Sequence, residues 1–142
     1  MEEQHSSIFP EITISYASFW ERFAAAFIDG LILIIPSYTI KYMIDGSLAG
    51  DGWGTWAPYL IQWLYYALLE SGNMQATLGK RAMGIRVADL EGNRISFGRA
   101  TGRYFGRILS AAILCIGYLM MLWDSKRQTL HDKLAGTIVI GR

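Results

Sequence analysis

Hydrophobic residues gather in long runs that are separated by polar segments. The first run covers about 19–44, and Ser18 with Glu21 forms a capping-box pattern at its start. At 1.5 Å per residue a helix of this length measures about 39 Å, which is enough to cross a hydrocarbon core of about 30 Å. A second apolar run covers 53–70, after a turn rich in glycine and aspartate. We therefore expect membrane-spanning helices over about 19–44 and 53–70.

The third apolar run, 104–123, follows a helix start that Ser96 is suited to cap. Lys and Arg are frequent in 71–103 and in the tail but absent from 45–53. The positive-inside rule therefore places both termini in the cytoplasm. A single crossing by 104–123 would place the tail outside. We expect this run to be broken near Gly117 and re-entrant, with three plain crossings as the alternative.

A β-rich pattern replaces the helical one between the second and third runs. Residues 84–90 are typical of a strand, 94–96 of a partner strand, and the turn between them carries hairpin residues. This predicts a cytosolic hairpin over about 83–96. The tail at about 136–141 is also β-rich, and we expect it to pair with 84–90. The predicted fold is one α-helical membrane domain with a small sheet.

The composition supports a membrane protein. Of the 142 residues, 52% are hydrophobic and 18% are charged, against about 25% charged in ordinary globular chains. The mean hydropathy is +0.24, and the five Trp and eight Tyr fit aromatic belts at membrane interfaces. The lipid bilayer is the expected partner. A net charge of +1 gives no reason to expect a nucleic-acid partner.

Neither a catalytic nor a metal-binding pattern is visible in the sequence. No Ser/His/Asp or Cys/His arrangement stands out, and His131 with Asp132 lacks spaced partners for a tetrahedral metal site. We expect no enzyme activity and no cofactor.

The charged residues within the apolar runs are the candidates for function. An ionised carboxylate such as Asp29 costs several kcal/mol inside a membrane unless it is paired or reached by water. Arg22 lies seven residues earlier, on the same helical face and about 10 Å away along the axis. We expect the two charges to be coupled. Gln62 in the second run also needs a polar partner.

Several motifs resemble the RDD family of bacterial membrane proteins. They are Glu21-Arg22-Phe23 with Ile28-Asp29, then Thr77-Leu78-Gly79-Lys80-Arg81, and the tail Arg127-Gln128-Thr129-Leu130-His131-Asp132-Lys133. The resemblance runs from about Tyr16 to Ile140. The family is named for one arginine and two aspartates. Arg22 and Asp29 match the first two, and Asp132 is matched to the second aspartate, with Asp124 as the less favoured candidate.

This resemblance implies a multi-pass protein of the bacterial plasma (inner) membrane. A role in transport has been proposed for the family, including sodium–proton exchange. It implies a site for a small cation or a proton-coupled solute on Arg22, Asp29 and Asp132. The candidates to support this site are a second set of polar residues: Gln62, Glu70, Arg103, Arg107, Arg127 and His131.

A second interpretation stays open. The same charges could be structural, in a non-transporting membrane scaffold or an accessory subunit. A chain this small cannot easily enclose a pathway alone, so both interpretations favour a homo-oligomer or a membrane partner. Pairing of the tail with 84–90 would bring Asp132 towards Arg22. We therefore predict that Arg22 lies within about 6 Å of Asp29 or Asp132, the range in which opposite charges interact strongly.

Overall fold

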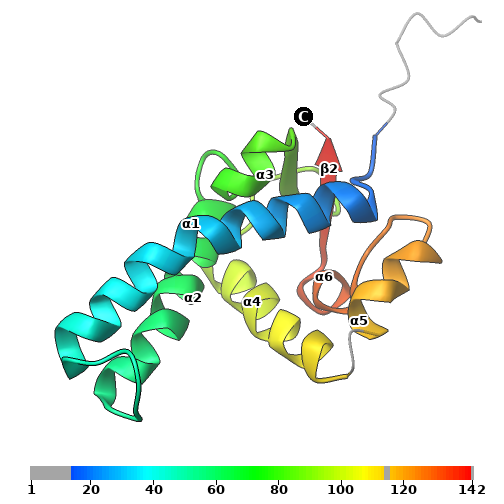
Figure 1. Cartoon of the computed structure of the whole chain (residues 1–142). Helices are drawn as coiled ribbons and strands as arrows, with labels where there is room; N and C mark the ends of the chain where they lie inside the picture. The colour runs from blue at the N-terminus through cyan, green and yellow to red at the C-terminus, as the bar shows by residue number, and fades with distance from the viewer. Residues whose placement is uncertain (1–13, 114–115, 142) are drawn as a thin grey trace, which may run out of the picture.

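Helices dominate the computed structural model, which describes residues 14–113 and 116–141. The long helix α1 lies across the molecule, with α2, α4, α5 and α6 below it and α3 above it in the view of Figure 1. The elements, in chain order, are α1 (Phe19–Asp45), η1 (Trp53–Trp56), α2 (Ala57–Ser71), α3 (Leu78–Ala82), β1 (Ile85–Asp89), α4 (Phe97–Ala112), α5 (Ile116–Leu119), η2 (Met120–Leu122), α6 (Leu130–Ala135) and β2 (Thr137–Gly141).

Helix α1 begins where the capping pattern predicts. The Ser18 hydroxyl accepts from the Glu21 amide at 3.3 Å, and the Glu21 carboxylate accepts from the Ser18 amide at 2.7 Å. Gly46, in the left-handed conformation, ends the helix. Within the described residues α1 is the one helix long and apolar enough to cross a membrane, and only 22% of its most apolar window is buried. Large apolar side chains such as Phe27 and Ile35 project outward, as expected of a lipid-facing surface.

The second apolar run folds differently from the prediction. Its first residues form the 3-10 helix η1, and α2 has only 15 residues, about 22 Å at 1.5 Å per residue. The reason lies in the turn after α1. The Asp45 carboxylate accepts from the Gly54 amide at 2.8 Å, and Lys41 Nζ lies 2.9 Å from that carboxylate. These contacts hold the turn against α1, and a spanning helix over 53–70 is not confirmed.

The third apolar run is interrupted, as predicted, but at a different place. Helix α4 starts at the expected N-cap, where the Ser96 hydroxyl accepts from the Arg99 amide at 3.2 Å, and ends at Ala112. The chain resumes with α5, so Gly117 lies inside a helix and not at the break. A Cβ on Gly117 would lie 2.6 Å from the Ser110 hydroxyl oxygen. Close packing of α5 on α4 therefore turns the chain back.

The tail strand pairs with 84–90, which confirms that prediction. Strands β1 and β2 are antiparallel, with Val87 opposite Val139. Tyr16 forms a bridge with Ile140 on the other edge of β2. The start of the described chain and its end therefore lie side by side (Figure 1).

The predicted partner strand at 94–96 is wrong. The Asp89 carboxylate accepts from the backbone amides of Glu91 and Asn93, at 2.9 and 2.8 Å, which closes a tight turn. Ser96 then caps α4. The chain has no room for a second strand between that turn and the helix, and β2 occupies the place beside β1.

Candidate functional site: a buried ion network beside a cavity

Two arginines share the carboxylate of Asp132. Arg22, on α1, places Nη2 at 2.6 Å from Oδ2, and Arg103, on α4, places Nη2 at 2.5 Å and Nε at 3.1 Å from Oδ1. Asp132 is fully buried in α6, and the Thr129 amide donates to Oδ2 at 3.1 Å. The predicted approach of Arg22 to Asp132 is confirmed. Asp132 therefore joins α1, α4 and the tail.

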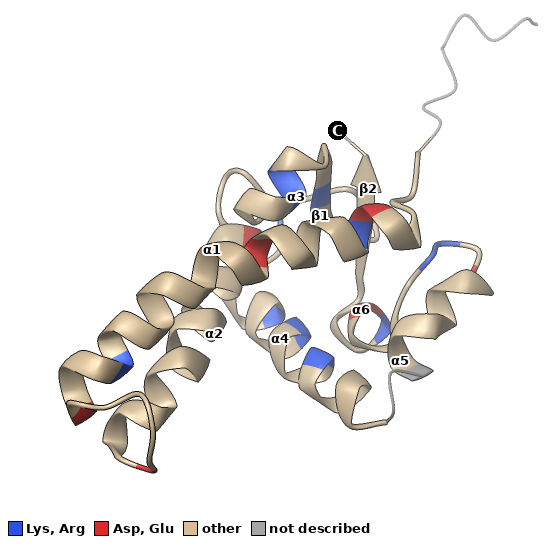
Figure 2. Cartoon of the chain, viewed as in Figure 1, with Lys and Arg blue, Asp and Glu red and all other residues tan. Residues whose placement is uncertain are grey.

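Glu70 extends this arrangement at the end of α2. Arg103 Nη1 lies 2.5 Å from Glu70 Oε2, and Lys80 of α3 forms an ion pair with Oε1. The result is a chain of alternating charges that connects five helices: Arg22, Asp132, Arg103, Glu70 and Lys80. Figure 2 shows the basic positions of α4 lying between α2 and α6. In a buried network of this kind each charge depends on its partners, because an unpaired charge is costly.

Arg107 is the least satisfied cation of the group. Its Nη2 lies 3.8 Å from Glu70 Oε1, beyond hydrogen-bond distance, and that oxygen is already paired with Lys80. Its guanidinium lies over the Tyr66 ring, 4.0 Å from the centroid. Its side chain is 21% exposed, whereas that of Arg103 is 1% exposed. Arg107 therefore interacts with the Tyr66 side chain but, among the described residues, has no carboxylate within hydrogen-bond distance.

Asp29 occupies a separate position from this chain of charges. Its carboxylate accepts from the Tyr65 hydroxyl and the Gly79 amide, both at 2.7 Å, and from the Thr77 hydroxyl at 2.6 Å. Within the described residues no hydrogen bond or ion pair joins it to Arg22. The expected pairing of Arg22 with Asp29 is therefore not seen, and instead one carboxylate, Asp132, lies between two arginines, Arg22 and Arg103.

The glycine of the Thr77–Arg81 motif has a packing reason. A Cβ on Gly79 would lie 2.1 Å from the carbonyl oxygen of Ala25 and 2.8 Å from the Asp29 carboxylate. Only a glycine lets the start of α3 approach α1 so closely. Gly79 thus presents its amide to the buried carboxylate.

A cavity of about 320 Å³ lies beside the network, at the lower end of the range for small-molecule pockets. Its apolar lining comes from the first turns of α1 and from the α5–η2 segment, with Phe19, Phe23, Ala26, Leu119 and Met121. Its charged lining, together with one histidine, consists of Arg22, Asp29, Lys80, Arg103, Arg107 and His131. Both predicted residues of α1 thus reach one cavity, although they bind different partners.

Three groups outside the long helices have altered protonation. Burial raises the pKa of the Asp132 carboxyl, but the Arg22 and Arg103 guanidiniums outweigh it and hold that pKa well below its usual range. Burial lowers the pKa of Lys80 to about 8, against the opposing effect of Glu70. Burial also lowers the pKa of His131 well below its usual value, so this imidazole is neutral at pH 7. Lys80 can therefore exchange a proton near physiological pH.

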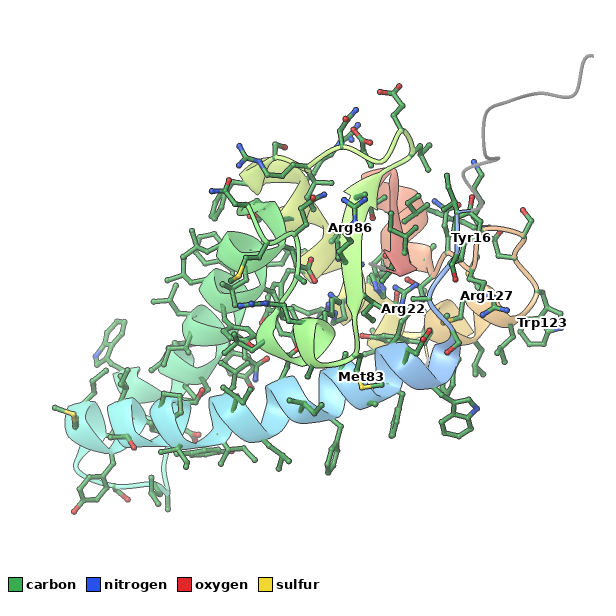
Figure 3. All side chains as sticks on the ribbon, turned by 90° about the horizontal axis from the view of Figure 1, so that it is seen from above. Tyr16, Arg22, Met83, Arg86, Trp123 and Arg127 are labelled. Atoms are coloured by element: carbon green, nitrogen blue, oxygen red, sulfur yellow. The ribbon has the colours of Figure 1, made fainter. Side chains whose placement is uncertain are left out.

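Three other candidates lie apart from this network. The Arg127 side chain is exposed, although its carbonyl oxygen accepts from Arg22 Nη1 at 3.0 Å, and Figure 3 shows the two residues on facing segments. Asp124 forms an ion pair with Lys133 at 3.0 Å, whereas the described partner of Arg22 is Asp132, so the geometry favours Asp132 as the second family aspartate. Gln62 lines a different groove, between α1 and α2.

Lys80, Thr77 and Tyr65 are site residues that the sequence prediction missed. Lys80 stands in a basic stretch, where a solvent-exposed lysine is the ordinary interpretation. One local feature of the sequence could have indicated that Lys80 is buried. Thr77 caps α3 and its hydroxyl accepts from the Lys80 amide, which turns this segment back towards α1 and α2.

The sequence model of the RDD family matches residues 16–136. The chain belongs to the RDD family. The uncharacterized protein YxaI of Bacillus subtilis is 38% identical to it, over 87% of this chain and 96% of that protein. The uncharacterized membrane protein YteJ of the same organism is 29% identical, over 91% of this chain and 83% of that protein. The proline-rich antigen of Mycobacterium leprae is 37% identical, over 79% of this chain and 47% of its own length.

No solved structure matches the chain. Membership of the RDD family, the similarity to the membrane protein YteJ and the apolar helix α1 together indicate a membrane location. Of the three residues that the resemblance matched to the family's name, Arg22 and Asp132 form an ion pair.

Proposed function

We propose that this RDD protein binds a small solute in the cavity between α1, α4 and α5 and moves it across the membrane together with a proton. The observation that carries the proposal is the cavity itself, which places Lys80 and Arg107 beside an apolar wall. A structural ion network needs no such space. The role is one of binding and transport and not of catalysis.

The carboxylates make a proton-coupled solute a better candidate than a small cation. Asp132 is saturated by two arginines, Glu70 by Arg103 and Lys80, and Asp29 by three uncharged donors. A cation site would need carboxylate oxygens that are free to bind it. Lys80, by contrast, has a pKa of about 8 and faces the cavity, so it can carry the coupled proton.

The arrangement of the chain ends supports the proposed topology. The residues at the start of α1 and strand β2 lie side by side, which favours one side of the membrane for both termini. The positive-inside rule makes that side the cytoplasm. Labelling of single cysteines at Ser47 and at the C-terminus tests this: a membrane-impermeant reagent added outside should reach only position 47.

The competing function is a membrane scaffold or accessory subunit. The observation that favours it is the network itself, which joins five helices through Asp132 and Glu70 and would serve rigidity equally well. If the protein is a scaffold, a substitution that fills the cavity but keeps every charged residue should not change its function.

The test uses purified protein in liposomes that contain a pH-sensitive dye. Anionic, cationic and neutral solutes are supplied outside in turn, and proton entry is recorded. We expect at least one class to drive proton entry faster than in protein-free liposomes. Ala26→Phe, which fills the cavity, should abolish this effect, and Ala111→Phe, an exposed position on α4 outside the cavity, should not. If no class moves protons, the scaffold function holds.

A further inference from the structure

The charges around the cavity do not balance. In the part of the chain that the structure describes, four cations line the cavity, namely Arg22, Lys80, Arg103 and Arg107. Three carboxylates oppose them: Asp29 in the lining, and Glu70 and Asp132 through their ion pairs. One positive charge is left over. A surplus charge in an apolar setting calls for a counterion.

The surplus is located at Arg107. The nearest carboxylate oxygen, on Glu70, already pairs with Lys80. The Arg107 guanidinium presents several N–H donors in one plane, a geometry that suits the oxygens of a carboxylate, sulfonate or phosphate group. An anionic head group placed here would complete the pairing of Arg107.

The rest of the wall is apolar. Phe19, Phe23 and Ala26 come from one face of α1, and Leu119 and Met121 face them from the tail side. An inorganic anion would leave these side chains without a partner, whereas a short hydrocarbon chain would cover them. The volume of about 320 Å³ holds roughly ten non-hydrogen atoms, at about 30 Å³ for each as in liquid water.

We infer that the solute is a small amphipathic monoanion, whose head group binds Arg107 and whose apolar part lies against Phe19, Phe23 and Leu119. This inference rests on the proposed function and names its solute. Binding requires protonated Lys80, because a neutral Lys80 would cancel the surplus charge without any anion. A site that holds neutral Lys80 therefore takes up the anion together with one proton, and the complex carries no net charge.

The groups that face Lys80 support this coupling. Glu70 and Tyr66 contact it from α2, while Arg103 and Arg107 act on it from α4. Asp29 of α1 and the neutral His131 of α6 line the same cavity. Two nearby guanidiniums and burial favour loss of the proton, and an anion on Arg107 offsets that effect.

The test measures binding by calorimetry to the full-length protein in phosphatidylcholine nanodiscs. Three probes separate charge from shape. Hexanesulfonate is a permanent monoanion with a hydrocarbon tail, hexyltrimethylammonium is a permanent cation with the same tail, and methanesulfonate is the same anion without the tail.

We expect hexanesulfonate to bind best and methanesulfonate more weakly. Hexyltrimethylammonium should not bind. If hexyltrimethylammonium binds as tightly as hexanesulfonate or more tightly, the inferred anion is wrong, but the cavity still binds a solute. If none of the three probes binds, the proposed function is wrong as well.

Variants locate the site. Arg107→Gln should weaken hexanesulfonate binding by at least about tenfold, the value of one charge-assisted hydrogen bond. Arg99→Gln is the control, because it removes an exposed arginine of the same helix that does not line the cavity. Equal affinity of the two variants places the anion elsewhere and overturns the assignment.

The pH dependence of the wild-type protein tests the coupled proton without any variant. Above about pH 8 the affinity for hexanesulfonate should fall about tenfold per pH unit, because Lys80 must first gain a proton. Lys80→Arg keeps the cation at all these pH values and should bind with an affinity that does not change. A flat profile in the wild type overturns the coupling.

A further binding experiment distinguishes a lipid head group from a free solute as the natural anion. Nanodiscs that contain phosphatidylglycerol offer a lipid head group with the same chemistry. Competition between this lipid and hexanesulfonate supports the monoanion site and assigns it to a lipid. Unchanged affinity in these nanodiscs supports the same site for a free solute.

Discussion

Arg22 and Asp132 lie 110 positions apart in the sequence, and their side chains meet at 2.6 Å. The contact ties the first turn of the long helix to the short helix in the tail. Because Asp132 also binds Arg103, its loss would leave two buried or half-buried guanidiniums without their shared carboxylate. The first prediction follows from this contact.

Asp132→Asn should lower the free energy of unfolding by about 3–5 kcal/mol, the usual result of removing one partner from a buried ion pair. Asp124→Asn is the matched control. Its carboxylate is at the surface, and its pair with Lys133 should contribute less than about 1 kcal/mol. Chemical denaturation in detergent measures both variants. Similar losses in the two would show that Asp132 is not a central member of the network.

Asp29 should be coupled to Thr77. Asp29→Asn replaces one acceptor oxygen by an amide group, so one of its three donors loses its partner, at about 1–3 kcal/mol. In a double-mutant cycle with Thr77→Val, the coupling energy should exceed about 0.5 kcal/mol. Strict additivity of the two changes would contradict the contact. This interaction, and not a pair with Arg22, explains how a carboxylate is tolerated in the first apolar run.

Two glycine-to-alanine substitutions should change stability in opposite directions, because one glycine is needed for close packing and the other only lowers helix propensity. Gly79→Ala should prevent normal folding, because the new methyl group would lie 2.1 Å from the Ala25 carbonyl oxygen. Gly102→Ala is the control, since no atom lies within 4 Å of a Cβ there. It should stabilise α4 by about 1 kcal/mol. Melting temperatures decide between them, and a tolerated Gly79→Ala would refute the close approach of α3 to α1.

Acid should destabilise the protein through His131. Its pKa in the folded state lies well below that in the unfolded state because of burial. Below about pH 6.5 the unfolded chain therefore binds a proton that the folded chain does not, and stability falls as pH falls. The slope should approach about 1.4 kcal/mol per pH unit for one proton. Denaturation curves between pH 7 and 5 measure it, and His131→Gln should flatten them. An equal slope in both proteins would contradict the neutral, buried imidazole.

Local signals predicted the parts of the fold that depend on local chemistry. Ser18 and Ser96 cap their helices as expected, since a capping hydroxyl needs only amides two or three residues away. The pairing of the tail with 84–90 followed from β-rich composition and from the placement of both segments on one side. The strand at 94–96 failed because a side chain, Asp89, closes a turn that the residue pattern does not reveal.

The site could be predicted only in part, because its contacts are long-range. The family resemblance led to Arg22, Asp29 and Asp132, and the expected supporting residues included Glu70, Arg103, Arg107 and His131. Lys80 was missed, since burial of a lysine depends on the fold and not on its neighbours in the chain. The partners of Asp29 were missed for the same reason. A carboxylate can be satisfied by hydroxyl and amide donors as well as by an arginine, and the sequence does not distinguish these possibilities.

The most direct measurement is the rate of proton entry into liposomes under an inward gradient of hexanesulfonate. The account predicts that the wild-type protein acidifies the interior faster than protein-free liposomes do. Arg107→Gln should reduce the rate to the protein-free level, and Arg99→Gln should leave it unchanged. Acidification no faster than in protein-free liposomes, or an unchanged rate in Arg107→Gln, would contradict proton-coupled uptake through this cavity.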